Sequence, residues 1–237
     1  MLNVSRYALL VAVALLSAGG CTSAPRAAPS PTRTPAALCI RDEEERAGGL
    51  HLPLAGGNRL DGVVLGSGDT GVVFANQSDG DLCTWKSAYG DYLSTKGYRV
   101  LLFNYSGGNP GQDVLAGVDA LRSRGVKKVF LIGASMGGTS VLYAAAHAQP
   151  AVAGTVDLSG PRVYSGVDAS AAVTTMTVPA IFVAAAADSP FAKDTQDLYA
   201  ACTSTDKKLD IEPGGEHGWG LVNDKISAMI EEFLKAH

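Results

Sequence analysis

Short apolar runs recur along the chain after residue 60, and each predicts a β-strand. The runs cover residues 61–65, 71–75, 98–103, 128–132, 152–158, 179–185 and 208–211. Several are continuously apolar, such as Val-Val-Phe-Ala at 72–75 and Val-Phe-Leu-Ile at 129–132. Continuous apolar runs are typical of strands covered on both faces of a parallel sheet.

Between these runs, apolar residues repeat at helical spacing. The stripes are Trp85, Ala88, Tyr89, Tyr92 and Leu93; then Val114, Val118 and Leu121; and finally Val222, Ile226, Met229, Ile230 and Phe233. The alternation of strands and helices predicts an α/β fold. We expect a three-layer sandwich in which a mostly parallel central sheet has helices on both faces, joined by right-handed crossovers.

The N-terminus has the pattern of an export signal. Arg6 precedes a ten-residue apolar run from Tyr7 to Leu16, and small residues follow it. This predicts a signal peptide over residues 1–20, because the run is too short to span a bilayer as a mature helix. The stretch Ala18-Gly19-Gly20-Cys21 resembles the lipobox of bacterial lipoproteins, although that family usually has Leu where Ala18 stands. The resemblance implies lipidation of Cys21 and a location at the outer face of the bacterial cytoplasmic membrane; ordinary signal cleavage with an incidental Cys21 is the alternative.

A linker and one folded domain are expected after the signal. Residues 21–37 are rich in Pro, Ala, Ser and Thr, which predicts an extended spacer. The remaining residues, 38–237, are enough for one domain. Cys202 falls on an apolar helical stripe and is expected to face the core, which leaves Cys39 and Cys83 to form a disulfide outside the cytoplasm.

Composition narrows the range of functions. The chain is 46% apolar and has a formal net charge of −4. This argues against disorder and gives no basic face for nucleic acid. No P-loop is present, no Cys or His residues stand at metal-ligand spacing, and no cofactor is implied.

One turn has the pattern of a nucleophile site. Gly133-Ala134-Ser135-Met136-Gly137 follows the strand at 128–132 and precedes a helix that runs to Ala148. This is G-x-S-x-G in its required context, where the serine is lifted above the sheet and bulky neighbours would clash. The Met136 amide, at the helix N-terminus, is a candidate to stabilise an oxyanion. A Gly-rich turn with a solvent-facing Ser is the alternative.

A serine nucleophile needs a base and an acid that orients it. His217 lies in a Gly-rich loop after the last predicted strand and is the base candidate; the other histidines are His51, His147 and His237. Asp188 follows the penultimate strand and is the first candidate for the acid, although it could instead cap the helix that starts at Phe191. Asp157, inside the preceding strand, is the second candidate.

The order Ser135, Asp188, His217, together with Gly133–Gly138 and Gly214–Gly218, resembles the α/β-hydrolase superfamily. The resemblance implies hydrolysis of an ester, thioester or related acyl bond. The dienelactone-hydrolase-like branch is similar in size, but its nucleophile is Cys where this chain has Ser135. Relatives often have His-Gly after the third strand, whereas this chain has Asn76-Gln77-Ser78; the second oxyanion donor is therefore the backbone N–H of Ser78 or Gln77.

Three functions remain open at this point. The first is a membrane-anchored serine esterase for a small or lipid-like acyl ester, and the second is an acyltransferase or thioesterase on the same residues. The third is a non-catalytic envelope-binding lipoprotein that keeps the fold. Residues 159–178 leave room for one crossover helix and no helical cap, so we expect an open, shallow site.

Overall fold

The structure is a computed structural model, and it describes residues 39–42 and 46–237. The expected signal peptide (1–20), the expected lipidation site Cys21 and the expected linker (21–37) lie outside these residues. Among the residues that are described, no helix is long and apolar enough to cross a membrane.

An eight-stranded sheet forms the centre of the domain, in the order β1-β2-β4-β3-β5-β6-β9-β10. The strands are β1 (Gly49–Pro53), β2 (Arg59–Leu65), β3 (Thr70–Ala75), β4 (Arg99–Asn104), β5 (Lys128–Ala134), β6 (Gly154–Leu158), β9 (Ala180–Ala185) and β10 (Lys207–Glu212). β1 and β2 pair antiparallel, β2 is antiparallel to β4, and the strands from β4 to β10 run parallel. The carboxyl ends of β3, β5, β9 and β10 therefore meet at one edge of the sheet.

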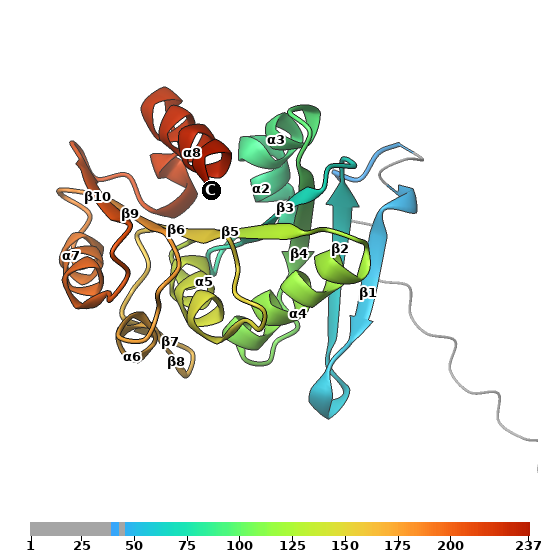
Figure 1. The fold of residues 1–237 in the computed structure, drawn as a ribbon, viewed down its shortest axis with the longest axis horizontal. Coiled ribbons are helices and arrows are strands. Elements are labelled where there is room, and N and C mark those ends of the chain that lie inside the picture. The colour runs from blue at the N-terminus through green and yellow to red at the C-terminus, as the bar shows by residue number, and fades with distance from the viewer. Residues whose placement is uncertain (1–38, 43–45) are drawn as a thin grey trace, which may run out of the picture. The chain divides into compact units, whose positions relative to one another are not determined.

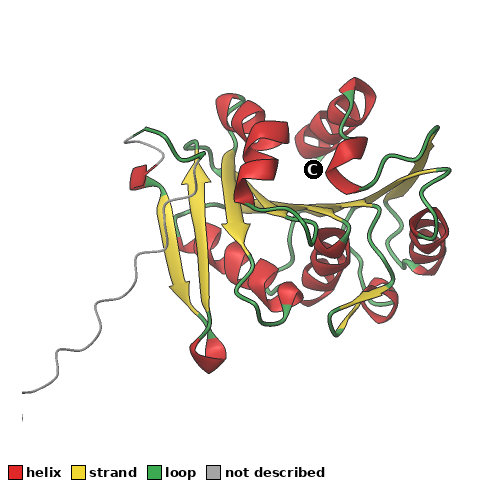
Figure 2. Cartoon of the chain, turned by 180° about the vertical axis from the view of Figure 1, so that it is seen from behind, coloured by secondary structure: helices red, strands yellow, loops and turns green. Residues whose placement is uncertain are grey.

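Helices cover both faces of this sheet (Figure 1). One face has α2 (Leu82–Trp85), a π-helical turn (Lys86–Gly90), α3 (Asp91–Thr95) and α8 (Asp224–Ala236). The other face has α4 (Pro110–Ser123), α5 (Met136–His147), α6 (Ala169–Val173) and α7 (Phe191–Ala201). The view from behind shows the same three layers, with β1 and β2 at one end of the sheet (Figure 2).

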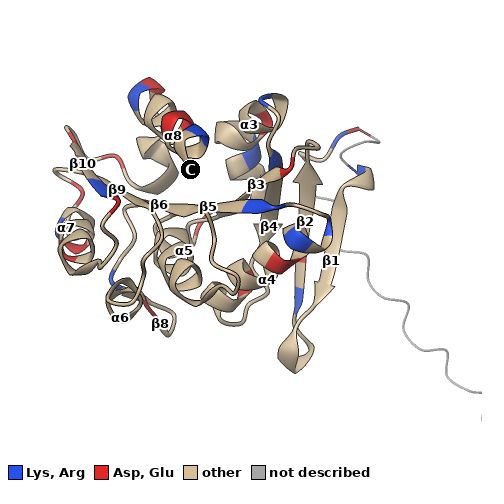
Figure 3. Ribbon diagram, viewed as in Figure 1, with Lys and Arg blue, Asp and Glu red and all other residues tan. Residues whose placement is uncertain are grey.

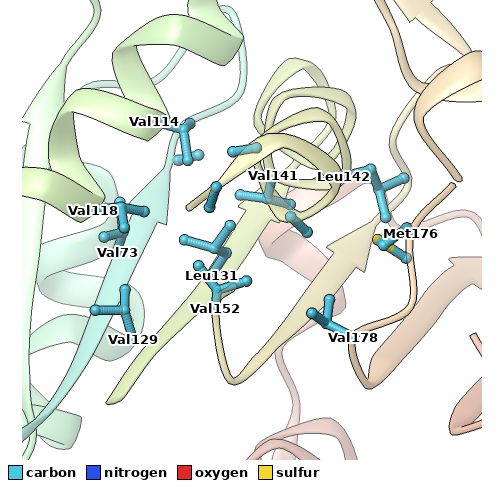
Figure 4. Close-up of a cluster of buried hydrophobic side chains, with 14 of the residues drawn as sticks. Val73, Val114, Val118, Val129, Leu131, Val141, Leu142, Val152, Met176 and Val178 are labelled. Atoms are coloured by element: carbon cyan, nitrogen blue, oxygen red, sulfur yellow. The ribbon is translucent and has the colours of Figure 1, made fainter. Parts of the chain in front are cut away.

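Two hydrophobic clusters lie between the layers because alternate residues of each strand point to opposite faces. On the α4–α5 side, Val73 and Leu131 from the sheet pack with Val114, Val118 and Val141 from the helices (Figure 4). On the other side, Trp85, Leu93 and Ile230 pack against Phe74 and Phe130. The central strands are largely free of charged residues, which lie mainly on helices and loops (Figure 3). Both clusters agree with the expected burial of the strands on both faces.

The predicted strands are all present, and the structure adds three more. β1 forms an antiparallel edge that places His51 beside Asp61, and β7 (Val163–Tyr164) pairs with β8 (Val167–Asp168) in a small hairpin. That hairpin and α6 occupy most of the segment between β6 and β9, and no helical cap is found there. β7 and β8 were missed because they have only two residues each.

The helical stripe at 85–93 is not one regular α-helix. It is divided among α2, the π-helical turn and α3, and Tyr89 packs inward from the turn. The C-terminal stripe begins too early in the prediction, because Val222 precedes the cap Asn223 and α8 starts at Asp224. A hydrophobic repeat cannot distinguish an α-helix from a helix with one widened turn.

The expected pairing of Cys39 with Cys83 is present, with the two Cα atoms 5.6 Å apart. Cys202 is free and buried, and it lies at the end of α7 where the chain packs on the core. The disulfide joins the start of the described domain to α2.

Candidate active site

Ser135 lies between the end of β5 and the start of α5. Its backbone has φ 51° and ψ −117°, which a non-glycine residue rarely adopts. The Ser135 N–H donates to the Leu158 carbonyl at 2.8 Å, and the Ser135 carbonyl accepts the first bond of α5, from Thr139 N–H. Ser135 is therefore held from β6 and from α5 in a backbone conformation that is strained locally.

Close backbone contacts explain the glycines of this turn. A Cβ on Gly133 would lie 2.2 Å from the Gly137 carbonyl oxygen, and a Cβ on Gly137 would lie 2.0 Å from the Ala75 carbonyl oxygen. Both distances are far below van der Waals contact. The end of β3, the turn at Ser135 and the first turn of α5 can approach this closely only because these positions lack side chains.

Asp188 and His217 form a hydrogen-bonded pair. Asp188 follows β9, His217 follows β10, and His217 Nδ1 donates to Asp188 Oδ2 at 2.8 Å. The Asp188 side chain is 8% exposed and that of His217 is 29% exposed. In a neutral imidazole this bond places the proton on Nδ1 and leaves Nε2 as the acceptor nitrogen.

Asp188 does not cap α7, and two of the other histidines have partners elsewhere in the fold. α7 begins after Pro190 with no side-chain cap, so Asp188 is not its N-cap and its carboxylate is committed to His217. His51 bonds to Asp61 in the edge strands, and His147 stacks on Tyr143 at the end of α5.

Among the described residues, Asp157 makes no hydrogen bond to His217. Its Oδ1 accepts from the Gly160 N–H at 2.9 Å, whereas Oδ2 has no partner among the described residues. The residue is fully buried, and this burial raises the pKa of the Asp157 carboxyl to about 7, with the Gly160 bond acting against the rise. A Cβ on Gly138 would lie 2.1 Å from Asp157 Oδ1, so the carboxyl group packs on the first turn of α5.

The loop that contains His217 lies beside the turn that contains Ser135. Gly218 follows His217, and a Cβ on Gly218 would lie 3.4 Å from the Cβ of Ala134, the residue before Ser135. The Phe191 ring from α7 covers His217, with ring centroids 4.2 Å apart. Ser135, His217 and Asp188 are thus gathered at the carboxyl edge of the parallel strands.

The loop after β3 is anchored through its carbonyls. Trp85 Nε1 donates to the Ala75 carbonyl, the Tyr105 hydroxyl donates to the Asn76 carbonyl, and both bonds are 3.0 Å long. Burial raises the pKa of Tyr105 above its usual range, which keeps the hydroxyl protonated as a donor. In the described part of the chain, nothing accepts a hydrogen bond from the backbone N–H of Gln77 or Ser78.

Two contacts of this site were not expected from the sequence. Phe191 was expected as the start of a helix, and in the structure its ring lies on His217. Gln77 was considered only as a backbone donor, whereas its side chain accepts from the Trp219 N–H. The position of Phe191 three residues after Asp188 was a usable signal; the contact of Gln77 with a loop 142 residues away was not.

No group of three or more His, Cys, Asp or Glu side chains is arranged to hold a metal ion within residues 39–42 and 46–237.

The fold and the site together define an α/β-hydrolase. The sequence matches the dienelactone hydrolase family over residues 108–231, just over half of the chain. The chain therefore belongs to the dienelactone hydrolase family, and it is a carboxylesterase-type hydrolase of ester bonds. No curated protein sequence matches the chain.

Several solved structures share the fold. An esterase from Pyrococcus furiosus has a TM-score of 0.68 and 16% identity, and the match covers 79% of this chain and 91% of that one. The dienelactone hydrolase from Anabaena variabilis has a TM-score of 0.62 and 20% identity, with 79% and 96% covered. Est1E from Butyrivibrio proteoclasticus has a TM-score of 0.64 and 16% identity, with 79% and 99% covered. At these identities the similarity establishes the fold.

Proposed function

We propose that the protein hydrolyses an ester-type acyl bond through an acyl-enzyme on Ser135. The observation that supports this most is the hydrogen bond between His217 Nδ1 and Asp188 Oδ2, beside a serine turn of the hydrolase type. A histidine whose Nδ1 proton is held by a buried carboxylate has its Nε2 lone pair available for a hydroxyl proton.

The reaction would proceed in two halves. His217 Nε2 takes the Ser135 hydroxyl proton as Oγ attacks the substrate carbonyl carbon, and it then gives that proton to the leaving alcohol as the ester bond breaks. Water next attacks the acyl-enzyme, loses a proton to His217, and releases the carboxylic acid while Ser135 regains its proton. Asp188 stabilises the imidazolium that forms in each half.

The oxyanion of each tetrahedral intermediate needs two donors. The Met136 N–H is at the N-terminus of α5, where it precedes the first intrahelical bond and lies at the positive end of the helix dipole. The second donor is the N–H of Ser78, with Gln77 as the alternative; both lie on the loop that Trp85 and Tyr105 anchor. Each such donor is worth about 10²–10³ in kcat.

Substitution of Ser135 and of Asp188 tests the proposal. Ser135→Ala, which removes the nucleophile, should abolish hydrolysis of p-nitrophenyl acetate without changing the circular dichroism spectrum or the Tm. Asp188→Asn, which leaves the imidazole in the wrong tautomer, should lower kcat by about 10⁴. Full activity in Ser135→Ala would refute the proposal.

Alternative acyl acceptors and substrates test whether the protein is a hydrolase, an acyltransferase or a thioesterase. Product analysis with added alcohols distinguishes transfer from hydrolysis, and matched ester and thioester substrates compare the two acyl classes. We expect the free acid from the ester as the main product. A dominant transfer product or a strong preference for the thioester would contradict the proposed hydrolase.

We further propose that the domain is anchored by a lipid on Cys21 at the outer face of the bacterial membrane, as the lipobox resemblance of residues 18–21 implies. The full chain, expressed in a bacterial host with a radiolabelled fatty acid, should take up the label and sediment with membranes. Cys21→Ser should lose both properties. Labelling that persists in Cys21→Ser would overturn this part of the proposal.

A further inference from the structure

The Gln77 side chain joins two loops of the proposed active site. Its Oε1 accepts a hydrogen bond from the Trp219 backbone N–H at 3.3 Å, and its Nε2 donates to Asp79 Oδ1 at 2.7 Å. Each end of the amide thus faces a partner of the opposite kind. Asp79 orients the amide so that its oxygen points to the loop that contains His217.

The Gln77 side chain lies close to the backbone of that loop. A Cβ on Gly218 would lie 2.3 Å from Gln77 Oε1, and Gly218 has φ +59°, which an L side chain adopts only with strain. The Gln77 amide therefore lies directly against the backbone that follows His217.

The loop that contains His217 is exposed on one side and held on the other. Gly215, Glu216 and Trp219 are exposed, whereas Gly218 and Leu221 are buried and the Gly214 carbonyl accepts from the Ala187 N–H at 2.8 Å. The exposed side has less burial to restrict its backbone, so a hydrogen bond there contributes more to its order. The Gln77 bond spans 142 residues of sequence and links the loop after β3 to the loop after β10.

We propose that Gln77 is a positioning residue that holds the His217 loop against the oxyanion loop. The inference rests on the proposed function, because it concerns the same site. When Oε1 is removed, the Trp219 N–H loses its acceptor and the loop samples more orientations. His217 Nε2 then faces the serine hydroxyl less often, so kcat falls while substrate binding changes little.

Gln77→Met tests the bond itself, because Met has a similar length and no amide. In the full chain we expect kcat for p-nitrophenyl acetate to fall by about 10- to 100-fold with KM nearly unchanged. Amide hydrogen exchange in the segment 218–221 should become faster. Gln196→Met, the same change at an exposed position of α7, is the control and should alter neither quantity. Unchanged kcat and unchanged exchange in Gln77→Met would overturn the inference.

Exchanging the amide at position 77 with the carboxylate at position 79 tests the orientation of the Gln77 amide. Gln77→Glu keeps an acceptor for the Trp219 N–H but places a second carboxylate against Asp79, so kcat should fall. Adding Asp79→Asn supplies a donor to the new carboxylate and should restore most of the lost kcat. The acidic limb of the kcat/KM profile should also move to higher pH, because a negative charge then lies beside the His217 loop. A double variant no better than Gln77→Glu, or an unmoved pH limb, would contradict the role.

The two proposals fail in different ways. If the wild type has no Ser135-dependent hydrolysis, the proposed function is wrong, and the positioning role falls with it even if exchange responds to Gln77→Met. If the wild type is active and Gln77→Met is equally active, only the positioning role is wrong.

Discussion

At the scale of single residues, the site depends on side chains that are missing as much as on those present. Ser135 has a positive φ, and Gly133 and Gly137 leave space for backbone atoms that would otherwise collide. The G-x-S-x-G pattern allowed the position of Ser135 to be predicted because the pattern encodes this local geometry. The Gln77 contact could not be predicted, because no local rule specifies which distant loop a polar side chain will meet.

Gly137→Ala should damage the site through the backbone. The added Cβ would lie 2.0 Å from the Ala75 carbonyl oxygen, so α5 and the end of β3 must move apart. We expect the free energy of unfolding to fall by about 1–3 kcal/mol and most esterase activity to be lost. Urea denaturation and p-nitrophenyl acetate turnover measure the two effects.

Gly215→Ala is the matched control for that prediction. Its Cβ would meet Ala187 at 3.8 Å, an ordinary contact, although Gly215 also lies near His217. Equal stability of Gly137→Ala and Gly215→Ala would show that the close approach is not a constraint.

Asp157→Asn should change how stability depends on pH. The folded-state pKa of about 7 exceeds the value of 3.8 expected in the unfolded chain, so the folded protein binds the proton more tightly. The stabilisation is complete below pH 4 and is lost as the pH rises to about 7, by at most about 1.4 kcal/mol per pH unit. Asp157→Asn has no ionisable group at this position, so its stability should not fall in this way as the pH rises.

Urea denaturation of wild type and Asp157→Asn between pH 4 and 8 measures the difference. The wild-type stability should decline relative to that of the variant as the pH rises. Parallel curves would show that Asp157 does not hold a proton in the folded state. Asp119→Asn, at an exposed position of α4, controls for the loss of one carboxylate.

At the scale of elements, hydrophobic periodicity located the long helices and strands well and the short or irregular ones poorly. β5 is apolar after its first residue, and its predicted and observed starts agree at Lys128. α2, the π-helical turn and α3 share one apolar stripe, so the sequence shows a single helix where the structure has a widened turn. The start of α2 depends instead on a cap.

Asp81→Ala should remove that cap. The Asp81 carboxylate accepts from the N–H groups of Cys83 and Thr84, at 2.8 and 3.2 Å, and the Thr84 hydroxyl accepts in return from the Asp81 N–H. Loss of this capping box should lower the free energy of unfolding by about 1 kcal/mol. Asp81→Asn retains a capping oxygen and should lose much less. Equal losses in the two variants by thermal denaturation would contradict the capping role.

At the scale of the whole described domain, strand–helix alternation predicted the class of fold, but not the order of its strands. That order depends on crossovers between elements far apart in sequence, which periodicity does not report. The antiparallel pair β1 and β2 extends the sheet at one end, and the disulfide ties the segment before β1 to α2. The stretch of sequence between Leu158 and Ala180 is short, and it correctly excluded a helical cap.

Removal of the disulfide should destabilise the domain as a whole. Cys39 and Cys83 are 44 residues apart in sequence, and closing a loop of that length lowers the entropy of the unfolded chain. The double variant Cys39→Ser/Cys83→Ser should lose up to about 4 kcal/mol of unfolding free energy. Dithiothreitol should produce the same loss in the wild type and none in the variant. Identical urea curves for oxidised and reduced wild type would contradict the contribution of this bond.

We propose Ser135 as the nucleophile of an ester hydrolase, and this role can be measured directly. The most direct measurement is labelling of the full chain with a fluorophosphonate probe, followed by peptide mapping. We expect one adduct, on Ser135, that forms together with the loss of esterase activity and is absent in Ser135→Ala. Labelling at another residue, or an active enzyme that the probe does not modify, would contradict it.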